Sequence, residues 1–121
     1  MNAELHPVLT IRLFTDQKCF GPGVATLLHR VREHHSLRAA AASMEMAYSK
    51  AWTILKNAEN CLGFPLLSSS RGGKNGGGAS LTQEAVKILD AYDRYSAALR
   101  DQAAAWFPDY FGAWVETEET L

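Results

Sequence analysis

The N-terminal part of the chain changes from a β-type hydrophobic pattern to a helical one. Residues 8–14, Val-Leu-Thr-Ile-Arg-Leu-Phe, are rich in β-branched and aromatic side chains, which predicts a strand. Residues 16–23 contain two glycines and a proline and are typical of a loop, with Pro22 near the first position of the next helix. That helix is expected to run to about His34, because one of its faces carries Val24, Leu27, Leu28 and Val31.

Two further helices, with a three-residue break between them, are predicted in the middle of the chain. Ser36 is a favourable N-cap for a short, alanine-rich helix over residues 37–44. A longer helix is expected over about residues 47–62, where Gly63 is suited to stop it. The break Glu45-Met46-Ala47 has the length of the turn in a helix-turn-helix unit.

A glycine-rich segment follows this unit and lies between two short strand candidates, residues 66–69 and 79–81. Five of the seven residues from 72 to 78 are glycine. Two strands joined in this way predict a hairpin, or wing, over about residues 66–82.

The last predicted element is a long helix over about residues 83–106, which Thr82 caps and Pro108 ends. At 1.5 Å per residue, about 24 residues span roughly 36 Å, more than a small domain needs to cover its own core. We therefore expect part of its apolar face to contact a partner. That face carries Ala85, Ile88, Leu89, Tyr92, Tyr95, Leu99, Ala103 and Trp106.

The length and composition fit one globular domain. Residues 1–121 are expected to form a single winged helix-turn-helix domain, with the helix-turn-helix at about 36–62 and a tail at 107–121 that is frayed and solvated from Glu116 onward. No apolar run approaches the ~20 residues of a membrane helix, and no signal peptide is visible, so a cytoplasmic protein is expected. The two cysteines, Cys19 and Cys61, could in principle pair, but two thiols do not make a disulfide framework, and buried, reduced thiols are the favoured interpretation.

Charge is distributed unevenly along the chain. The net charge is −1, which taken alone argues against a nucleic-acid partner. Between His29 and Thr82, however, seven lysines and arginines face three acidic residues, a net charge of +4 that leaves −5 for the rest. A basic middle with acidic flanks suits a protein that presents one face to an anion.

The longer helix of the helix-turn-helix unit has one apolar and one polar face. The apolar stripe consists of Ala51, Leu55, Ala58 and Leu62, with Trp52 and Ile54 beside it. The opposite face carries Ser49, Lys50, Thr53, Lys56, Asn57 and Asn60. A DNA major groove admits one helix whose N-terminal side chains contact base edges, which would be Tyr48, Ser49, Lys50 and Thr53 here, with Lys56 near phosphates. The alternative is an ordinary solvated face.

The glycine-rich segment favours the DNA-binding interpretation. Its glycines let the backbone approach another molecule closely while Arg71 and Lys74 project outward, as expected of a wing on phosphates or in a minor groove. A nucleotide-binding loop is rejected, because Asn75 follows Gly73-Lys74 where a Walker motif needs Ser or Thr, and no helix follows directly.

Other chemistry has little support in the sequence. The adjacent His34 and His35, with His29 before them, point to different sides of a helix and lack a completing cluster of Cys or carboxylates, so no metal site is expected. Residues 68–70 are serines without the strand-turn-helix context of a nucleophile or an evident His/Asp relay. We expect no enzymatic activity and no cofactor. Trp52 and Trp106 are expected to be core or interface aromatics.

Four segments together resemble the N-terminal DNA-binding domain of the ModE-type, molybdate-dependent transcriptional regulators, which are related to LysR-type winged helices. They are Phe20-Gly21-Pro22-Gly23, Ser36-Leu37-Arg38-Ala39-Ala40-Ala41, Tyr48-Ser49-Lys50-Ala51-Trp52, and Gly63 to Leu67 through Gly72 to Thr82. The resemblance covers roughly residues 7–105. It implies a mainly α fold with a small β-wing: a winged helix-turn-helix with an N-terminal strand and a long C-terminal dimerisation helix.

The resemblance implies a sequence-specific transcriptional regulator of double-stranded DNA, linked to molybdate or metal homeostasis, that forms a homodimer through its first and last helices. Together with the patterns above, it gives these candidate DNA-binding residues: Ser36, Arg38, Tyr48, Ser49, Lys50, Thr53, Lys56, Arg71, Gly72, Gly73, Lys74 and Asn75. Members that sense molybdate do so with a separate C-terminal domain. Because the sequence ends soon after the long helix, no molybdate site is expected in this chain.

Three positions depart from the pattern of the family. Glu45 stands in the turn where a glycine is usual, Ala47 replaces a serine that would cap the next helix, and Asn75 interrupts the wing glycines. Glu45 and Ala47, with the net charge of −1, support an alternative in which the chain is a winged-helix protein-interaction module that does not bind DNA.

Overall fold

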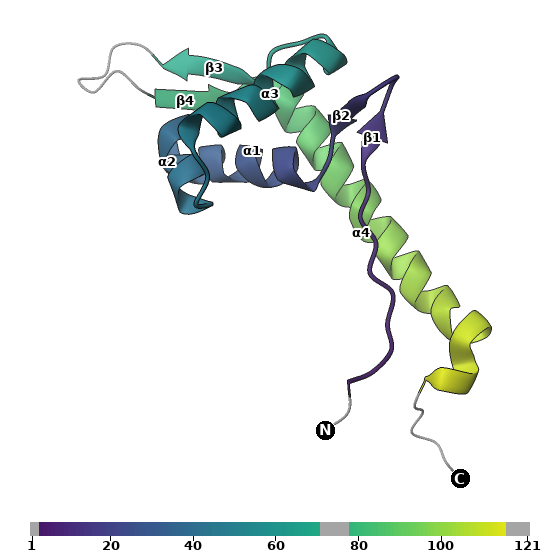
Figure 1. Cartoon of the computed structure of the whole chain (residues 1–121). Helices are drawn as coiled ribbons and strands as arrows, with labels where there is room; N and C mark the ends of the chain where they lie inside the picture. The colour runs from purple at the N-terminus through teal and green to yellow at the C-terminus, as the bar shows by residue number, and fades with distance from the viewer. Residues whose placement is uncertain (1–2, 71–77, 116–121) are drawn as a thin grey trace. The chain divides into compact units, whose positions relative to one another are not determined.

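The computed structural model describes residues 3–70 and 78–115, which fall into two compact units. One unit is Thr10–Tyr92, and the other combines Met1–Leu9 with Asp93–Leu121. Figure 1 shows the element order. It is β1 (Leu13–Phe14), β2 (Lys18–Phe20), α1 (Pro22–His34), α2 (Leu37–Ser43), α3 (Tyr48–Leu62), β3 (Leu67–Ser70), β4 (Gly78–Leu81), α4 (Gln83–Phe111) and a 3₁₀ turn, η1 (Gly112–Trp114). The fold is the expected one, mainly α with small strand pairs in a winged helix-turn-helix arrangement.

The helix ends follow the local signals in the sequence. Ser36 caps α2, because its Oγ accepts a hydrogen bond from the Ala39 N–H at 3.0 Å. Gly63 ends α3 with φ +89°, a left-handed conformation that glycine adopts without a Cβ penalty. Thr82 caps α4 by accepting from the Ala85 N–H at 3.0 Å. The predicted caps are confirmed.

The N-terminal hairpin differs from the prediction. A strand was expected over residues 8–14, but only Leu13–Phe14 forms one, and its partner β2 lies inside the predicted loop. A strand needs a neighbour to hydrogen-bond with, and residue spacing alone does not show where that neighbour is. Earlier in the segment, the Ile11 carbonyl instead accepts a hydrogen bond from the Tyr92 hydroxyl at 2.7 Å.

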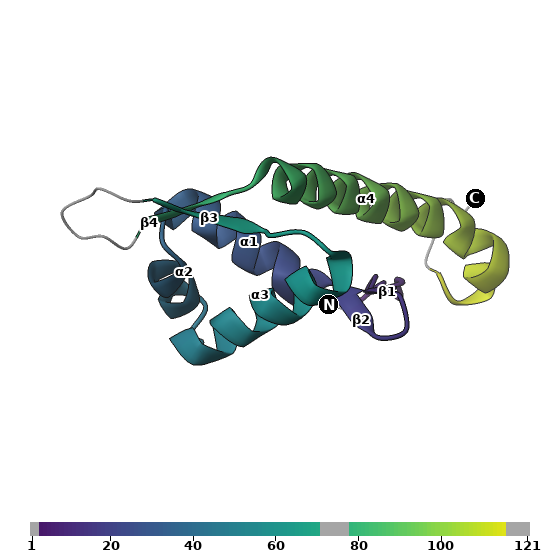
Figure 2. The ribbon, with the colours of Figure 1, turned by 90° about the horizontal axis from the view of Figure 1, so that it is seen from above.

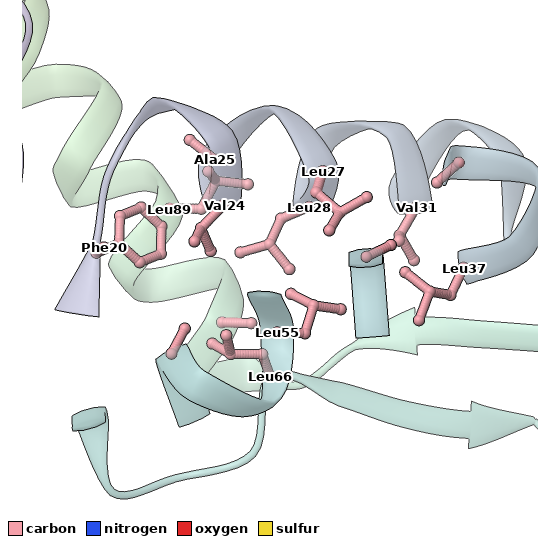
Figure 3. Close-up of a cluster of buried hydrophobic side chains, with 14 of the residues drawn as sticks. Phe20, Val24, Ala25, Leu27, Leu28, Val31, Leu37, Leu55, Leu66 and Leu89 are labelled. Atoms are coloured by element: carbon pink, nitrogen blue, oxygen red, sulfur yellow. The ribbon is translucent and has the colours of Figure 1, made fainter. Parts of the chain in front are cut away.

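The core of the Thr10–Tyr92 unit is built around α1. Leu27, Leu28 and Val31 are fully buried, and Figure 3 shows side chains of this helix directed at Leu55 of α3 and at Leu66. Phe20 of β2, also fully buried, lies 5.1 Å from the Tyr92 ring between centroids. The core therefore joins β2, α1, α3 and the start of α4.

Small residues let α2 and α3 approach the core closely. Ala40, Ala41 and Ala51 are at most 1% exposed. An alanine Cβ occupies little space, so neighbouring helix backbones can lie near one another at these positions. Arg30 of α1 adds a polar link by donating to the Ser43 Oγ at 2.9 Å.

The hairpin β3–β4 is antiparallel, with Leu67 opposite Leu81 and Ser70 opposite Gly78. Both strands begin or end within one residue of their predicted bounds. A backbone hydrogen bond from the Thr82 N–H to the Leu66 carbonyl, at 3.0 Å, closes the base of the hairpin. Nearer the other end of β4, the Ala79 N–H donates to the His35 carbonyl at 2.9 Å and ties the hairpin to the end of α1.

The long helix α4 runs farther than expected. Pro108 was predicted to end it, but the helix continues to Phe111 with this proline inside. Proline removes one backbone hydrogen bond. Aromatic packing opposes that loss here: the ring centroids of Phe107 and Phe111 are 4.7 Å apart, and those of Phe111 and Trp114 of η1 are 6.3 Å apart. The end of the predicted tail, residues 116–121, lies outside the described residues.

The apolar face of α4 is mostly buried in its first part, whereas its second part combines the partly buried Leu99 and Ala103 with exposed aromatic residues. Ala85, Leu89 and Tyr92 belong to the core, whereas Tyr95 is 56% and Trp106 is 55% exposed. Trp106 is therefore not a core residue of the chain. None of the helices in the described ranges is long and apolar enough to cross a lipid bilayer.

Cys19 and Cys61 form a disulfide, so the expectation of reduced thiols is wrong. The prediction failed because β2 and the end of α3, 42 residues apart in sequence, bring the two Cα atoms to 5.3 Å, within the usual range for a disulfide. Cys19 is buried and Cys61 is partly exposed. The covalent link joins β2, the strand before α1, to the last turn of α3.

Reduction of this disulfide should destabilise the protein. In the chain-entropy description, a crosslink that closes a loop of this length stabilises the folded state by about 4 kcal/mol. We expect urea unfolding of the oxidised protein to give a free energy about 2–4 kcal/mol above that of the protein in dithiothreitol. Cys61→Ser is the matched control, since its stability should not respond to the reductant. Equal stabilities of oxidised and reduced wild type would refute the crosslink.

Candidate nucleic-acid interface

The turn between α2 and α3 is held by backbone hydrogen bonds and one unusual residue. The N–H groups of Glu45 and Met46 donate to the carbonyls of Ala42 and Ala41, at 3.0 and 2.9 Å. Glu45 has φ +56°, the left-handed conformation that favours glycine. Ala47, the N-cap of α3, makes no side-chain cap. The turn is therefore tight despite lacking the residues that usually ease it.

The polar face predicted for α3 is exposed to solvent. Ser49, Lys50 and Thr53 are all exposed, on the side opposite Ala51, Leu55 and Ala58, which are buried. Leu62, the fourth residue of the predicted stripe, is only partly buried. The first two turns of α3 thus present a hydroxyl, an ammonium and a second hydroxyl outward, a set able to contact both base edges and phosphates.

Helix α3 and the hairpin flank one open hollow of about 360 Å³. In both Figure 1 and Figure 2, α2 and the strands β3 and β4 lie at the same end of their unit, where α3 begins. The lining comes from all of them: Leu37, Arg38, Tyr48, Trp52, Leu55, Lys56, Glu59, Leu67, Ser69, Gly78 and Ala79. The helix and the base of the wing therefore face the same space, which we call the helix–wing hollow.

Two cations lie over two aromatic rings along this hollow. The Arg38 guanidinium of α2 lies 4.3 Å from the centroid of the Tyr48 ring, and the Lys56 ammonium lies 5.4 Å from that of Trp52. Both distances are within the range of cation–π attraction. The rings hold the long basic side chains along the hollow while Arg38 and Lys56 stay exposed.

Trp52 was not among the predicted site residues. It was expected to be a core or interface aromatic, but it is 47% exposed and so does not belong to the core. The sequence did contain a signal for this exposure, because Trp52 lies beside the buried stripe and not in it, on the side of α3 that carries Lys56.

Glu59 is a second residue that the sequence did not indicate. Its Oε1 lies 3.2 Å from the Lys56 Nζ, and its Oε2 accepts a hydrogen bond from the Leu66 N–H at 2.7 Å. One carboxylate thus contacts both a cation of α3 and the backbone immediately before β3.

The other predicted residues divide into two groups. Ser36 caps α2, with its Oγ occupied by the Ala39 N–H. Arg71, Gly72, Gly73, Lys74 and Asn75 lie outside the described residues, between the paired ends Ser70 and Gly78 of the two strands. Within residues 3–70 and 78–115, no three His, Cys, Asp or Glu side chains are grouped so as to hold a metal ion.

Comparison with known proteins points to one family. Residues 25–86 match the family described as "Bacterial regulatory helix-turn-helix protein, lysR family", a range from α1 to the start of α4. That range covers α2, the turn, α3 and the hairpin, which are the elements that form the helix–wing hollow.

Similar curated proteins carry regulatory and molybdenum-related names. The chain is 37% identical over 93 residues to the transcriptional regulator ModE of Haemophilus influenzae, and 34% identical over 73 residues to the molybdenum-pterin-binding protein MopB of Rhodobacter capsulatus. It is 31% identical over 94 residues to the DNA-binding transcriptional dual regulator ModE of Escherichia coli. These matches cover 76%, 60% and 77% of the chain but only 35%, 27% and 34% of the relatives. The chain spans about a third of their length.

The left-handed Glu45 gives a test of the turn. Replacing a non-glycine residue in this conformation by glycine relieves roughly 1 kcal/mol of steric strain, because glycine has no Cβ. Glu45→Gly should therefore raise the free energy of unfolding by up to about 1 kcal/mol. Glu45→Ala removes the same carboxylate but keeps the Cβ, and it should bring no such gain. Chemical denaturation of the three proteins measures the difference. A Glu45→Ala variant as stable as Glu45→Gly would argue against backbone strain at this position.

Proposed function

The chain belongs to the bacterial regulatory helix-turn-helix proteins of the lysR family, and we propose that it binds double-stranded DNA as a sequence-specific transcriptional regulator. The observation that carries the proposal is the helix–wing hollow. Tyr48, Trp52 and Lys56 of α3 line one cavity together with residues of β3 and β4, and aromatic rings hold Arg38 and Lys56 along it. The exposed Ser49, Lys50 and Thr53 lie on the same helix. A duplex presents its major groove beside a phosphate backbone, which is the chemistry that this surface complements.

In this proposal α3 enters a major groove. Ser49, Lys50 and Thr53 contact base edges from its first two turns, with Tyr48 at its N-terminal end. Phosphates are contacted by Arg38 and Lys56 at the hollow, by the start of α2 at Ser36, and by the wing residues Arg71, Gly72, Gly73, Lys74 and Asn75. Base contacts then give specificity, and phosphate contacts give affinity and register.

We further propose that the protein is a homodimer through α1 and α4 and acts in the cytoplasm. The exposed aromatic side chains of Tyr95 and Trp106 on α4 support it, since single large aromatic side chains gain most from burial at an interface. Two protomers related by a two-fold axis would contact half-sites about 34 Å apart, or a multiple of that distance, in a palindromic site.

The names of the curated relatives support a link between the regulated genes and molybdate or metal homeostasis. The prediction that residues 1–121 themselves hold no molybdate site stands as a proposal, to be tested by calorimetry with molybdate.

The DNA-binding proposal is tested by selecting fragments from random duplexes and then measuring how affinity depends on salt. Arg71→Ala and Lys74→Ala should each weaken binding to every sequence. Each should also make the negative slope of log K against log salt shallower by about 0.9, the value for one lost phosphate contact. Lys50→Ala should instead change which sequences are selected.

The contrast between these variants is the internal control. Failure of the wild type to retard any duplex at low salt, where non-specific binding is strongest, would favour the protein-interaction alternative over a regulator. Salt slopes that do not differ between wild type and the wing variants would remove the wing from the interface.

The dimer proposal is tested with a charge introduced on either face of α4. Trp106→Glu should convert the dimer to a monomer in sedimentation velocity, because a carboxylate would be buried without a partner. Ala105→Glu introduces the same side chain on the exposed neighbouring position, off the apolar stripe, and should remain dimeric. Identical sedimentation of the two variants would show that this stripe is not the interface.

A further inference from the structure

Glu59 is placed between the two parts of the proposed interface. It lies on α3, its side chain is only 15% exposed, and it is one of the residues that line the helix–wing hollow. Its Oε2 accepts from the N–H of Leu66, a fully buried residue whose carbonyl accepts from the Thr82 N–H. Through this one side chain, α3 is fastened to the base of both wing strands.

The second oxygen of Glu59 is bound to a cation that would otherwise be available for DNA. Lys56 Nζ lies 3.2 Å from Oε1, and the Lys56 side chain is 48% exposed. A phosphate that approaches the hollow therefore meets an ammonium group already paired with an internal anion.

Fastening the wing does not require a negative charge. A glutamine at this position would offer the Leu66 N–H a carbonyl oxygen of similar reach. The Lys56 side chain is 48% exposed, so water screens its ion pair with Glu59, and that pair adds little to stability. The charge of Glu59 therefore acts mainly on Lys56.

We propose that Glu59 is a positioning residue with two separable actions, an inference that rests on the proposed DNA-binding function. Its hydrogen bond to Leu66 fixes the position of the wing relative to α3. Its charge competes with DNA phosphate for Lys56, so that binding exchanges one ion pair for another and the affinity for any duplex is held down.

The Glu59→Gln variant separates the two actions. It keeps an acceptor for Leu66 and releases Lys56, so its binding to a fixed duplex should show a salt slope steeper by up to about 0.9 and an affinity roughly tenfold higher near 0.1 M salt. Glu4→Gln, which removes the same charge from an exposed position before β1, should leave both quantities unchanged. Glu59→Ala loses the Leu66 bond as well and should bind more weakly than Glu59→Gln, the conservative variant that rescues it.

Variants that lack Lys56 test whether the charge of Glu59 acts through this lysine. In the double variant Lys56→Gln/Glu59→Gln the steeper salt slope should disappear. In Lys56→Gln alone, the salt slope should become shallower than that of the wild type by clearly less than about 0.9, the value for one phosphate contact. The latter measurement does not depend on how Glu59 variants fold.

Two results would overturn the inference while leaving the regulator proposal intact. One is a Glu59→Gln slope equal to that of the wild type, and the other is a loss of a full 0.9 in Lys56→Gln alone, since either shows Lys56 free to bind phosphate already. Absence of any DNA binding by the wild type at low salt would overturn both proposals together.

Discussion

Burial of one face of α1 is the constraint on which the Thr10–Tyr92 unit depends. Leu27, Leu28 and Val31 are completely removed from solvent, and burial of each such side chain contributes about 1.5–3 kcal/mol. The elements that cover this face come from both sides of it in the sequence: β2 before it, and α2, α3, Leu66 and the start of α4 after it. Because α3 and the residue preceding β3 pack on the same helix, α3 and the wing cannot be positioned independently.

The helix–wing hollow is a consequence of that shared packing. Leu55 of α3 and Leu66 both belong to the core, and Figure 3 shows them near each other. Leu55 also lines the hollow, which α3 and the two strands border together. Aromatic rings line it and hold Arg38 and Lys56 at its edge. Exposed basic side chains otherwise sample many rotamers in water, and the ring contact gives each of these two a preferred position. Preorganised cations lose less conformational entropy when a phosphate arrives.

The turn and the disulfide show two ways in which this chain departs from a relaxed helix-turn-helix. Glu45 adopts a left-handed conformation without glycine, and α3 begins at Ala47 without a side-chain cap. Both features weaken the N-terminal side of α3. The link between Cys19 and Cys61 acts at the opposite end, where it attaches α3 to the segment before α1. The recognition helix is thus restrained most strongly away from the bases that it is proposed to contact.

The sequence by itself determined the local elements. Helical spacing located α1 to α3, and the caps at Ser36, Gly63 and Thr82 were identified because each acts on backbone groups within a few residues of itself. The exposed face with Ser49 and Lys50 followed from the same periodicity. Resemblance to a known family supplied the order of the elements and the winged arrangement.

Tertiary structure decided everything that depends on two distant segments meeting. Nothing in their spacing pairs Cys19 with Cys61 or Glu59 with Leu66, since these contacts exist only once β2, α3 and the hairpin have packed on α1. The continuation of α4 past Pro108 was also missed, although the contacts there are local: the rings of Phe107 and Phe111 stack across the proline, and Trp114 packs on Phe111. Local rules describe forces along the chain, whereas the site arises from forces between segments that only the folded protein brings together.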